Sequence, residues 1–309
     1  MKFNFDFNAN AKKYFAISLM LFALIAVATA VFGVKLDLQF RGGSIITYAY
    51  DGALDQTAFE QKLESVLNED VSLQASSDVI TGANTFIVSL PGNRSISSDK
   101  LVELNDALMA DFAESGPRTL EISNVDPTIG KEFLGKCIAA LALAMVLMML
   151  YVALRFSKIG GLSAGAMGVV ALLHDCVIVF GVFVIFGIPI NDNFIAVILT
   201  ILGFSLNDTI VIYDRIRENK RLYGSKLKVG ELVSKSINQS LTRSINTSVT
   251  AIMSMVVVTV VAMIYGVDSI FSFSFPLILG LISGSYSSIC IAGPLWVKWM
   301  ERKARLKSA

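Results

Sequence analysis

Long apolar runs alternate with short polar connectors over most of this 309-residue chain, and one longer polar segment interrupts them. A membrane-spanning helix needs about 20 mostly apolar residues to cross a hydrocarbon core about 30 Å thick. Six runs meet this requirement, at residues 14–34, 133–154, 161–186, 192–213, 244–265 and 270–297. The pattern therefore predicts an all-α bundle of six transmembrane helices.

The first run ends near an Ala-Thr-Ala sequence that mimics a signal-peptidase site. A cleavable signal has an apolar run of only roughly 7–15 residues, and this run is longer. We therefore expect the first run to be an uncleaved membrane span.

The segment 35–132, between the first two runs, has the pattern of an α+β domain. Extended or alternating runs predict strands, and apolar residues at helical spacing predict helices. The predicted strands are 38–50, 71–75, 85–91 and 118–125, and the predicted helices are 55–67 and 97–115. The second helix begins with Ser and Asp residues that suit an N-cap. The order β-α-β-β-α-β predicts an inserted ferredoxin-like domain.

Lys and Arg gather near one set of span ends, which predicts the orientation of the chain. They occur before the first run, between the second and third, in the 214–243 linker and in the tail, whereas the connectors 187–193 and 265–269 contain none. Both termini are therefore expected in the cytoplasm and the 35–132 segment outside it. The predicted organisation is 1–34 (N-terminus and first helix), 35–132 (periplasmic domain), 133–213 (helices 2–4), 214–243 (cytoplasmic amphipathic linker), 244–297 (helices 5–6) and 298–309 (basic tail).

Ile212 and Ile216 share a face at the start of this linker, against surrounding charges. A basic amphipathic helix of this kind binds lipid headgroups or docks on a partner protein, and the pattern does not separate the two.

Composition excludes several classes of function. Hydrophobic residues make up 54% of the chain and charged residues only 17%, against about 25% in soluble domains. The net charge of +1 predicts no bulk attraction to nucleic acid. Three cysteines inside apolar runs and one histidine give no disulfide framework and no multi-histidine metal site. We expect neither a cofactor nor a resident metal, and no enzymatic activity.

Asp208 is the clearest candidate for chemistry. It follows Asn207 about two-thirds of the way along the fourth run. Ionisable residues within a bilayer are expensive and usually mark an ion pathway, a relay or a partner charge. Asp208 is either a group that binds and releases an ion or a structural hydrogen-bonding residue near the headgroups.

Arg243 lies at the entrance of the fifth run and is the obvious counter-charge for Asp208. It is either that counter-charge or an ordinary positive anchor at the membrane surface. Asn246, Thr247 and Ser248 follow it, and an entrance this polar suits a protein interior or a wet cavity better than lipid.

His174 and Asp175 lie near the middle of the third run. Adjacent helical residues point about 100° apart, so their side chains need not meet. They either join Asp208 in an ion-coupling network or serve as static contacts between helices. Gly280, Ser283, Gly284 and Ser287 in the sixth run have the spacing of small residues that let helices approach closely.

Three motifs, GFSLNDTIVIYDRIREN (203–219), SINQSLTRSINTSVTA (236–251) and ALLHD (171–175), together resemble the SecF branch of the SecD/SecF family, within the resistance-nodulation-division superfamily. The resemblance implies a bacterial inner-membrane subunit that works with a SecD-like subunit, the Sec channel, membrane lipids and a translocating unfolded polypeptide. It also implies coupling to an H⁺ or Na⁺ gradient, with Asp208 and Arg243 at the positions of the family's membrane-embedded aspartate and its paired arginine.

One departure concerns the start of the 35–132 segment. Where the family has a D-F-T-G-G run, this chain has Gln39-Phe40-Arg41-Gly42-Gly43, which keeps the glycines but not the acidic and hydroxyl residues.

Two alternatives to an export subunit driven by an ion gradient remain: a passive assembly scaffold of the translocon, and a half-transporter that exports small molecules or lipids.

Overall fold

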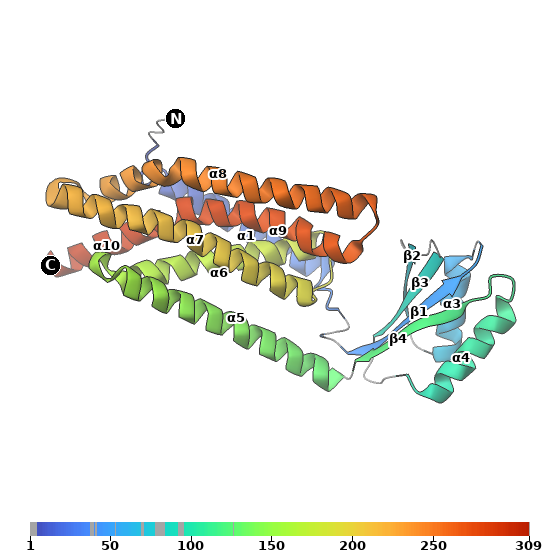
Figure 1. Ribbon diagram of the computed structural model, residues 1–309. Coiled ribbons are helices and arrows are strands. Elements are labelled where there is room, and N and C mark those ends of the chain that lie inside the picture. Colours follow the sequence, from blue (N-terminus) through green and yellow to red (C-terminus); the bar gives the residue numbers. More distant parts are fainter. Residues whose placement is uncertain are drawn as a thin grey trace. The chain divides into compact units, whose positions relative to one another are not determined.

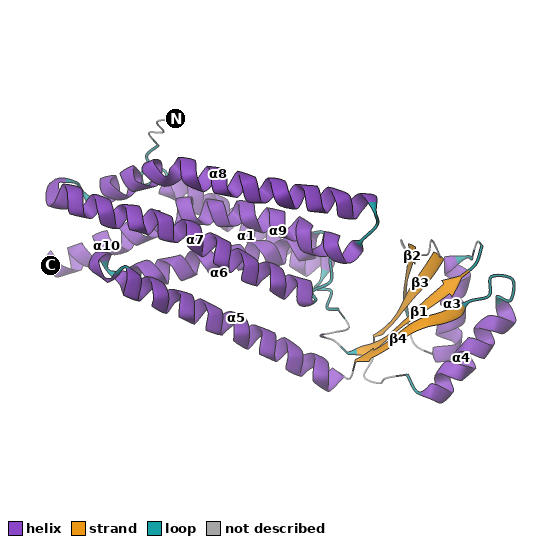
Figure 2. Ribbon diagram, in the orientation of Figure 1, coloured by secondary structure: helices purple, strands orange, loops and turns teal. Residues whose placement is uncertain are grey.

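The computed structural model describes residues 5–308 except 38–39, 41, 53, 69–70, 78–83, 92–95 and 126. The described chain is mostly helical and divides into two compact units (Figures 1 and 2). The helical unit comprises Met1–Lys35, Ala139–Ala262 and Asp268–Ala309. The α/β unit comprises Leu36–Ile138 and Met263–Val267. Gln39 and Arg41 of the divergent Gln-Phe-Arg-Gly-Gly run lie outside the described residues.

Within the described part of the chain, six helices are long and apolar enough to cross a membrane, as the apolar runs predict. They are α1 (Ala11–Phe32), α5 (Pro127–Arg155), α6 (Gly161–Ile185), α7 (Asp192–Tyr223), α8 (Val229–Ile264) and α9 (Asp268–Ser287), which leads through η3 (Ser288–Ala292) into α10 (Gly293–Ser308). The spans on α6, α7 and α9–α10 are half or more buried, whereas those on α1, α5 and α8 are 11–17% buried. The first three therefore form the centre of the helical unit, and the others leave broad apolar faces uncovered.

Helices α7 and α8 differ from their predicted bounds because both continue through most of the 214–243 linker. A short turn at Gly224–Lys226 joins them. Ile212 and Ile216 are buried against Leu232, Val233 and Ile237 in the core of the helical unit. Their shared apolar face therefore packs on this chain's own helices rather than on lipid headgroups. Near the turn, Asn219 Nδ2 donates to Ser236 Oγ (2.8 Å) and Gln239 Oε1 (2.7 Å), which pairs the two helices.

Segment η3 interrupts the sixth span with one π-helical turn. Such turns shift the register of a helix by one residue and are frequent at functional sites. Side chains before and after the turn therefore face directions that a regular α-helix does not allow.

The α/β unit has the predicted β-α-β-β-α-β element order. Its elements are β1 (Gly43–Tyr50), α3 (Gln56–Leu67), β2 (Ser72–Ser77), β3 (Asn84–Pro91), α4 (Ser98–Asp111) and β4 (Arg118–Val125). The sheet order is β2-β3-β1-β4 and every pairing is antiparallel. Ser97 caps α4 as predicted, because its side chain accepts a hydrogen bond from Lys100 N. Helices and sheet close over an apolar core that includes Ile46, Phe59 and Leu104.

Candidate functional site

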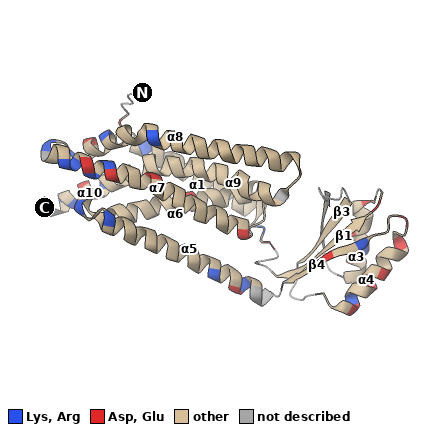
Figure 3. Cartoon of the chain, viewed as in Figure 1, with Lys and Arg blue, Asp and Glu red and all other residues tan. Residues whose placement is uncertain are grey.

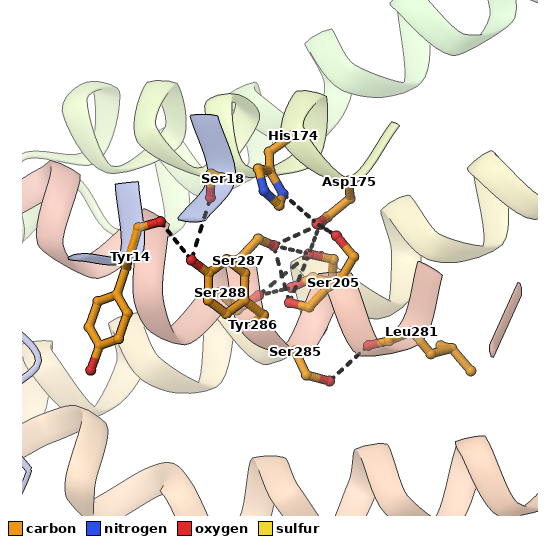
Figure 4. Close-up of polar contacts among 12 residues, drawn as sticks. Tyr14, Ser18, His174, Asp175, Ser205, Leu281, Ser285, Tyr286, Ser287 and Ser288 are labelled. Carbon is orange, nitrogen blue, oxygen red and sulfur yellow. Dashed lines mark hydrogen bonds and ion pairs between the residues drawn. The ribbon is translucent and has the colours of Figure 1, made fainter. Parts of the chain in front are cut away.

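Asp175 lies at the centre of the helical unit, on α6, with 0% of its surface exposed. Three serine hydroxyls donate to its carboxylate. Ser205 of α7 donates to Oδ2 (2.8 Å), Ser283 of α9 to Oδ1 (2.7 Å) and Ser287 of α9 to Oδ2 (2.7 Å). The carboxylate thus joins the three central helices (Figure 4).

Two further hydroxyls extend this arrangement. Ser288 Oγ donates to Ser205 O (2.9 Å) and lies 2.9 Å from Thr209 Oγ1. We call Ser205, Thr209, Ser283, Ser287 and Ser288 the hydroxyl cluster. All five are buried, with at most 7% exposure.

The end of α9 and the start of η3 supply most of these groups. Ser283 and Ser287 are four residues apart, share a face of the helix and both donate to Asp175 on α6. Ser288, the first residue of η3, contacts Ser205 and Thr209 on α7. Two neighbouring serines thus reach two different helices (Figure 4).

His174 contacts the same carboxylate through Nδ1, which lies 3.2 Å from Asp175 Oδ1. Its ring contacts those of Phe22 on α1 (5.3 Å between centroids) and Tyr286 on α9 (5.9 Å). Tyr286 in turn donates from its hydroxyl to Tyr14 O (2.8 Å). The second imidazole nitrogen, Nε2, is buried and has no hydrogen-bond partner among the described residues.

Asp208 has a different environment, midway along α7. It is 2% exposed, and its Oδ2 is buried without a hydrogen-bond partner in the described chain. Ser244 and Arg243 of α8 are the polar residues of that helix nearest to its carboxylate. Ser244 Oγ is likewise buried and unpartnered. A buried carboxylate oxygen and a buried hydroxyl without partners mark an incomplete polar site.

The α8 residues near Asp208 lie largely on the surface of this chain. Arg243, Asn246 and Thr247 are exposed, and no ion pair joins Arg243 to Asp208 in the described structure. Asn246 and Thr247 line a shallow groove beside Phe204 of α7. Ser248, by contrast, is buried and its Oγ lies 2.6 Å from Ser285 Oγ. Uncovered polar side chains on a span suit a wet cavity or a partner helix.

The structure therefore groups the predicted site residues in two places. His174 and Asp175 contact each other, and Asp208 lies apart from them, facing α8. Asn207 is exposed and joins neither group. Sequence reasoning missed Ser205, Thr209, Ser288 and Ser244 as partners and treated Ser283 and Ser287 as packing residues. Their only sequence signal is an unusual density of hydroxyl residues within apolar runs. No group of three or more His, Cys, Asp or Glu side chains that could hold a metal occurs in the described part of the chain.

Comparison with known proteins identifies relatives over the whole chain. The family model "Protein export membrane protein SecD/SecF, C-terminal" matches residues 107–302. Protein translocase subunit SecF of Calditerrivibrio nitroreducens is 33% identical over 297 residues, covering 94% of this chain and 93% of the relative. Protein translocase subunit SecDF of Bacillus subtilis is 32% identical over 305 residues, covering 98% of this chain but 39% of the relative.

A solved structure shares the fold. The crystal structure of SecDF, a translocon-associated membrane protein from Thermus thermophilus, superposes with a TM-score of 0.78 at 30% identity, covering 97% of this chain and 39% of that one. This chain therefore spans about two fifths of the SecDF chains that it matches. With six candidate spanning helices, these similarities identify a multi-pass membrane protein.

Proposed function

Because this chain belongs to the SecD/SecF family of protein export membrane proteins, we propose that it is a subunit of the Sec protein-export complex of the bacterial inner membrane. Its relatives are translocase subunits and not known catalytic enzymes, so we propose transport without enzymatic catalysis or a cofactor. The proposed role of this subunit is in a late step of polypeptide translocation, in which an unfolded chain leaves the Sec channel.

The proposed partner is a SecD-like subunit. The Bacillus subtilis and Thermus thermophilus relatives are single SecDF chains, of which this chain covers 39% in each case. The remaining length of those proteins is what a separate subunit would supply here. The uncovered polar residues of α8 support an assembly in which another helix or a shared wet cavity covers this face.

Asp208 is the proposed coupling group. The observation that carries the proposal is its buried, unpartnered carboxylate oxygen midway along a candidate span. Such a group is stabilised by taking up H⁺ or Na⁺, or by approach of a cation such as the Arg243 guanidinium. Arg243 is exposed beside it, so a shift of α8 or arrival of the partner would change the charge balance at Asp208. His174 and Asp175 are proposed to support this relay through Ser205, which donates to Asp175 and lies one helical turn before Asp208 on α7.

The α/β unit is proposed to be a ferredoxin-like domain outside the cytoplasm that holds the exported polypeptide. Its β-α-β-β-α-β order and its antiparallel β4-β1-β3-β2 sheet support this fold. Lys and Arg gather at the end of the helical unit where α10 ends and α7 meets α8 (Figure 3). By the positive-inside rule, both termini are then cytoplasmic. Ion passage at Asp208 would change helix packing and move this domain between capture and release.

The test is export of a slow-folding reporter in cells whose only copy of this subunit carries Asp208→Asn. We expect export to fail while the variant still co-purifies with the SecD-like subunit in normal amounts. Asn207→Ala, an exposed neighbour, is the matched control and should export normally. Wild-type export by Asp208→Asn would reject the coupling role.

A passive scaffold is the second candidate. The saturated hydrogen bonds of Asp175 favour it, because a carboxylate that joins three helices stabilises their assembly whether or not ions move. In that case Asp208→Asn would either assemble and export normally or lose export only in step with lost co-purification.

A further inference from the structure

A groove of about 310 Å³ lies between α1, α6 and the segment from η3 into α10, all within the helical unit. Phe15 and Phe22 line it on α1, Val170 and Val177 on α6, and Leu295 on α10. On both α1 and α6 the lining residues recur at i, i+3, i+4 and i+7, so each helix contributes one continuous face. The groove therefore follows the direction of these two helices.

The groove closes at one end because α1 and α6 touch there. A Cβ at Gly181 of α6 would overlap the Ile25 side chain of α1, so the two helices approach closely at this glycine. The contact lies one turn beyond Phe22 and Val177, which are the last lining residues of the two helices. From Phe15 to Ile25 α1 rises about 15 Å, and half of a hydrocarbon core is also about 15 Å. The groove thus has the depth of a single leaflet.

The walls of the groove are apolar and accessible to lipid. Leu19, Val170 and Leu173 are 70%, 42% and 47% exposed, and they lie on candidate spans. The polar lining residues, Ser18 and His174, are both buried. Such walls suit a hydrocarbon chain and offer little to a polar ligand.

The open end of the groove is basic. Lys298 of α10 lies over the Phe15 ring, with Nζ 4.2 Å from the ring centroid. Lys12 precedes Phe15 by three residues and shares its face of α1. Among the described residues, neither lysine forms an ion pair with a carboxylate. Ammonium groups at a span end extend toward the headgroups and attract anionic lipid there.

We propose that this groove binds an anionic phospholipid, with one acyl chain between α1 and α6 and the phosphate at Lys298 and Lys12. The depth and the apolar walls select the acyl chain, and the unpaired ammonium groups select the negative headgroup. A zwitterionic phospholipid has the same chains but adds a positive group, which the lysines would repel. The site requires only that the helical unit lies in a membrane, so it does not depend on ion coupling at Asp208.

The test is the thermal stability of the full chain, exchanged into detergent that removes bound lipid, at fixed pH and ionic strength. Palmitoyl-oleoyl phosphatidylglycerol is titrated against phosphatidylcholine with the same chains, because a ligand that binds only the folded state raises the melting temperature in a saturable way. Glycerol phosphate without acyl chains forms the third arm. Lys298→Gln removes the headgroup contact. Lys303→Gln, an exposed lysine further along α10, removes the same charge outside the groove and is the matched control.

A second pair of variants tests the acyl chain site. Val170→Phe fills the groove from an exposed position, and Leu162→Phe places the same ring on an exposed part of α6 outside the lining. If Val170→Phe fails to fold, Leu173→Phe replaces it.

We expect the wild type to be stabilised saturably by phosphatidylglycerol, less by phosphatidylcholine and not by glycerol phosphate. In Lys298→Gln the half-saturating phosphatidylglycerol concentration should rise about fivefold, the effect typical of one basic residue at an anionic membrane surface. Val170→Phe should lose the saturable response, whereas Lys303→Gln and Leu162→Phe should keep it.

Three results would each overturn the proposal. The first is an equal response of the wild type to the two phospholipids, which would mean unselective lipid contact. The second is an equal response to glycerol phosphate, which would mean a simple anion site. The third is a variant of either pair that behaves like its matched control. Because the readout is lipid binding and not export, none of these results bears on Asp208.

Discussion

The helical unit and the α/β unit bury very different side chains. Among described residues, the helical unit buries His174, Asp175 and Asp208 together with a row of serines and threonines. The α/β unit buries no charged residue in its described part, and its buried polar side chains there, besides the Tyr48 hydroxyl, are Ser44 and Thr85. Its core is otherwise aliphatic and aromatic.

This difference places the candidate ion-coupling residues in the helical unit alone, in keeping with the proposed division between ion coupling there and a mechanical role for the α/β unit. Burying charged groups costs stability unless they are paired or hydrogen-bonded, so the buried ionisable residues of the helical unit are candidates for a functional role. The α/β unit has an ordinary apolar core, as expected for a module that binds or moves. Within the helical unit the two aspartates differ again, since Asp175 is hydrogen-bonded within the chain and Asp208 is not.

The largest effect is expected for Asp175→Asn. The amide keeps the shape of the side chain but turns an NH₂ group toward hydroxyl donors, so at least one buried hydroxyl loses its acceptor. We expect a loss of at least ~2 kcal/mol of stability in detergent unfolding. Asp208→Asn, the matched substitution at an unpartnered carboxylate, should leave stability unchanged or higher. Equal losses in the two variants would contradict the distinction between the two aspartates.

Gly280→Ala tests whether the central helices are closely packed around these groups. A Cβ at Gly280 would overlap the Ile201 side chain and lie 3.1 Å from Val179 Cγ2. Overpacking of this kind costs about 2 kcal/mol. At Gly203, also in a span, a Cβ meets nothing within 4 Å. Gly203→Ala should therefore be neutral or slightly stabilising in the same thermal unfolding measurement, and a comparable loss in both variants would argue against close packing at Gly280.

Arg243→Cys tests whether the exposed face of α8 is covered by a partner. In a background lacking Cys137, Cys176 and Cys290, a water-soluble thiol reagent should label this position in the isolated chain. In the complex with the SecD-like subunit we expect labelling to slow by at least about tenfold, equivalent to about 1.4 kcal/mol.

Lys226→Cys is the control for this labelling, because Lys226 is exposed at the turn between α7 and α8. Its labelling should stay fast in both states. Unchanged labelling of Arg243→Cys in the complex would mean that the partner covers another surface.

Tyr48 gives the smallest effect and tests the apolar character of the α/β unit. Burial raises the pKa of Tyr48 to about 12 from 10.0, and the nearby Thr119 hydroxyl lowers it in part. The Tyr48 hydroxyl donates to Asn105 Oδ1 (3.1 Å). Below pH 10 the phenol is protonated in both the folded and the unfolded state, so it adds no pH dependence. Between pH 10 and 12 the unfolded state ionises first, so stability falls as pH rises, by about 1 kcal/mol at pH 11.

Tyrosinate absorbance of the full chain, wild type minus Tyr48→Phe, measures this group directly. The difference should titrate near pH 12. A midpoint near pH 10, the ordinary value for tyrosine, would show that the core around Tyr48 is wet.

Periodicity was sufficient to predict the element order of the α/β unit and the positions of the spans. The strand at 118–125 has the bounds of β4, and the helix at 55–67 begins one residue before α3 (Gln56–Leu67). Turn and cap residues mark the ends of these elements in the local sequence, so the ends can be predicted without knowledge of tertiary contacts.

The hydroxyl cluster and the lengths of α7 and α8 could not be predicted from periodicity. Serines in spans commonly donate to the carbonyl four residues back, as Ser285 does to Leu281. Their presence alone therefore does not say which of them face a carboxylate. That depends on the π turn and on how α6, α7 and α9 pack. Ile212 and Ile216 show the amphipathic pattern of an interfacial helix equally well, and only the packing of α8 identifies their partners.

The central claim is that Asp208 couples an ion gradient to export. The most direct measurement is the rate of polypeptide export into inner-membrane vesicles with and without ionophores that collapse the H⁺ and Na⁺ gradients, using complexes of equal subunit content. We predict that collapse slows export by the wild type to the rate of Asp208→Asn, and that the variant is insensitive to the gradients. A variant that still loses export when the gradients collapse would contradict the claim, because another group would then carry the coupling.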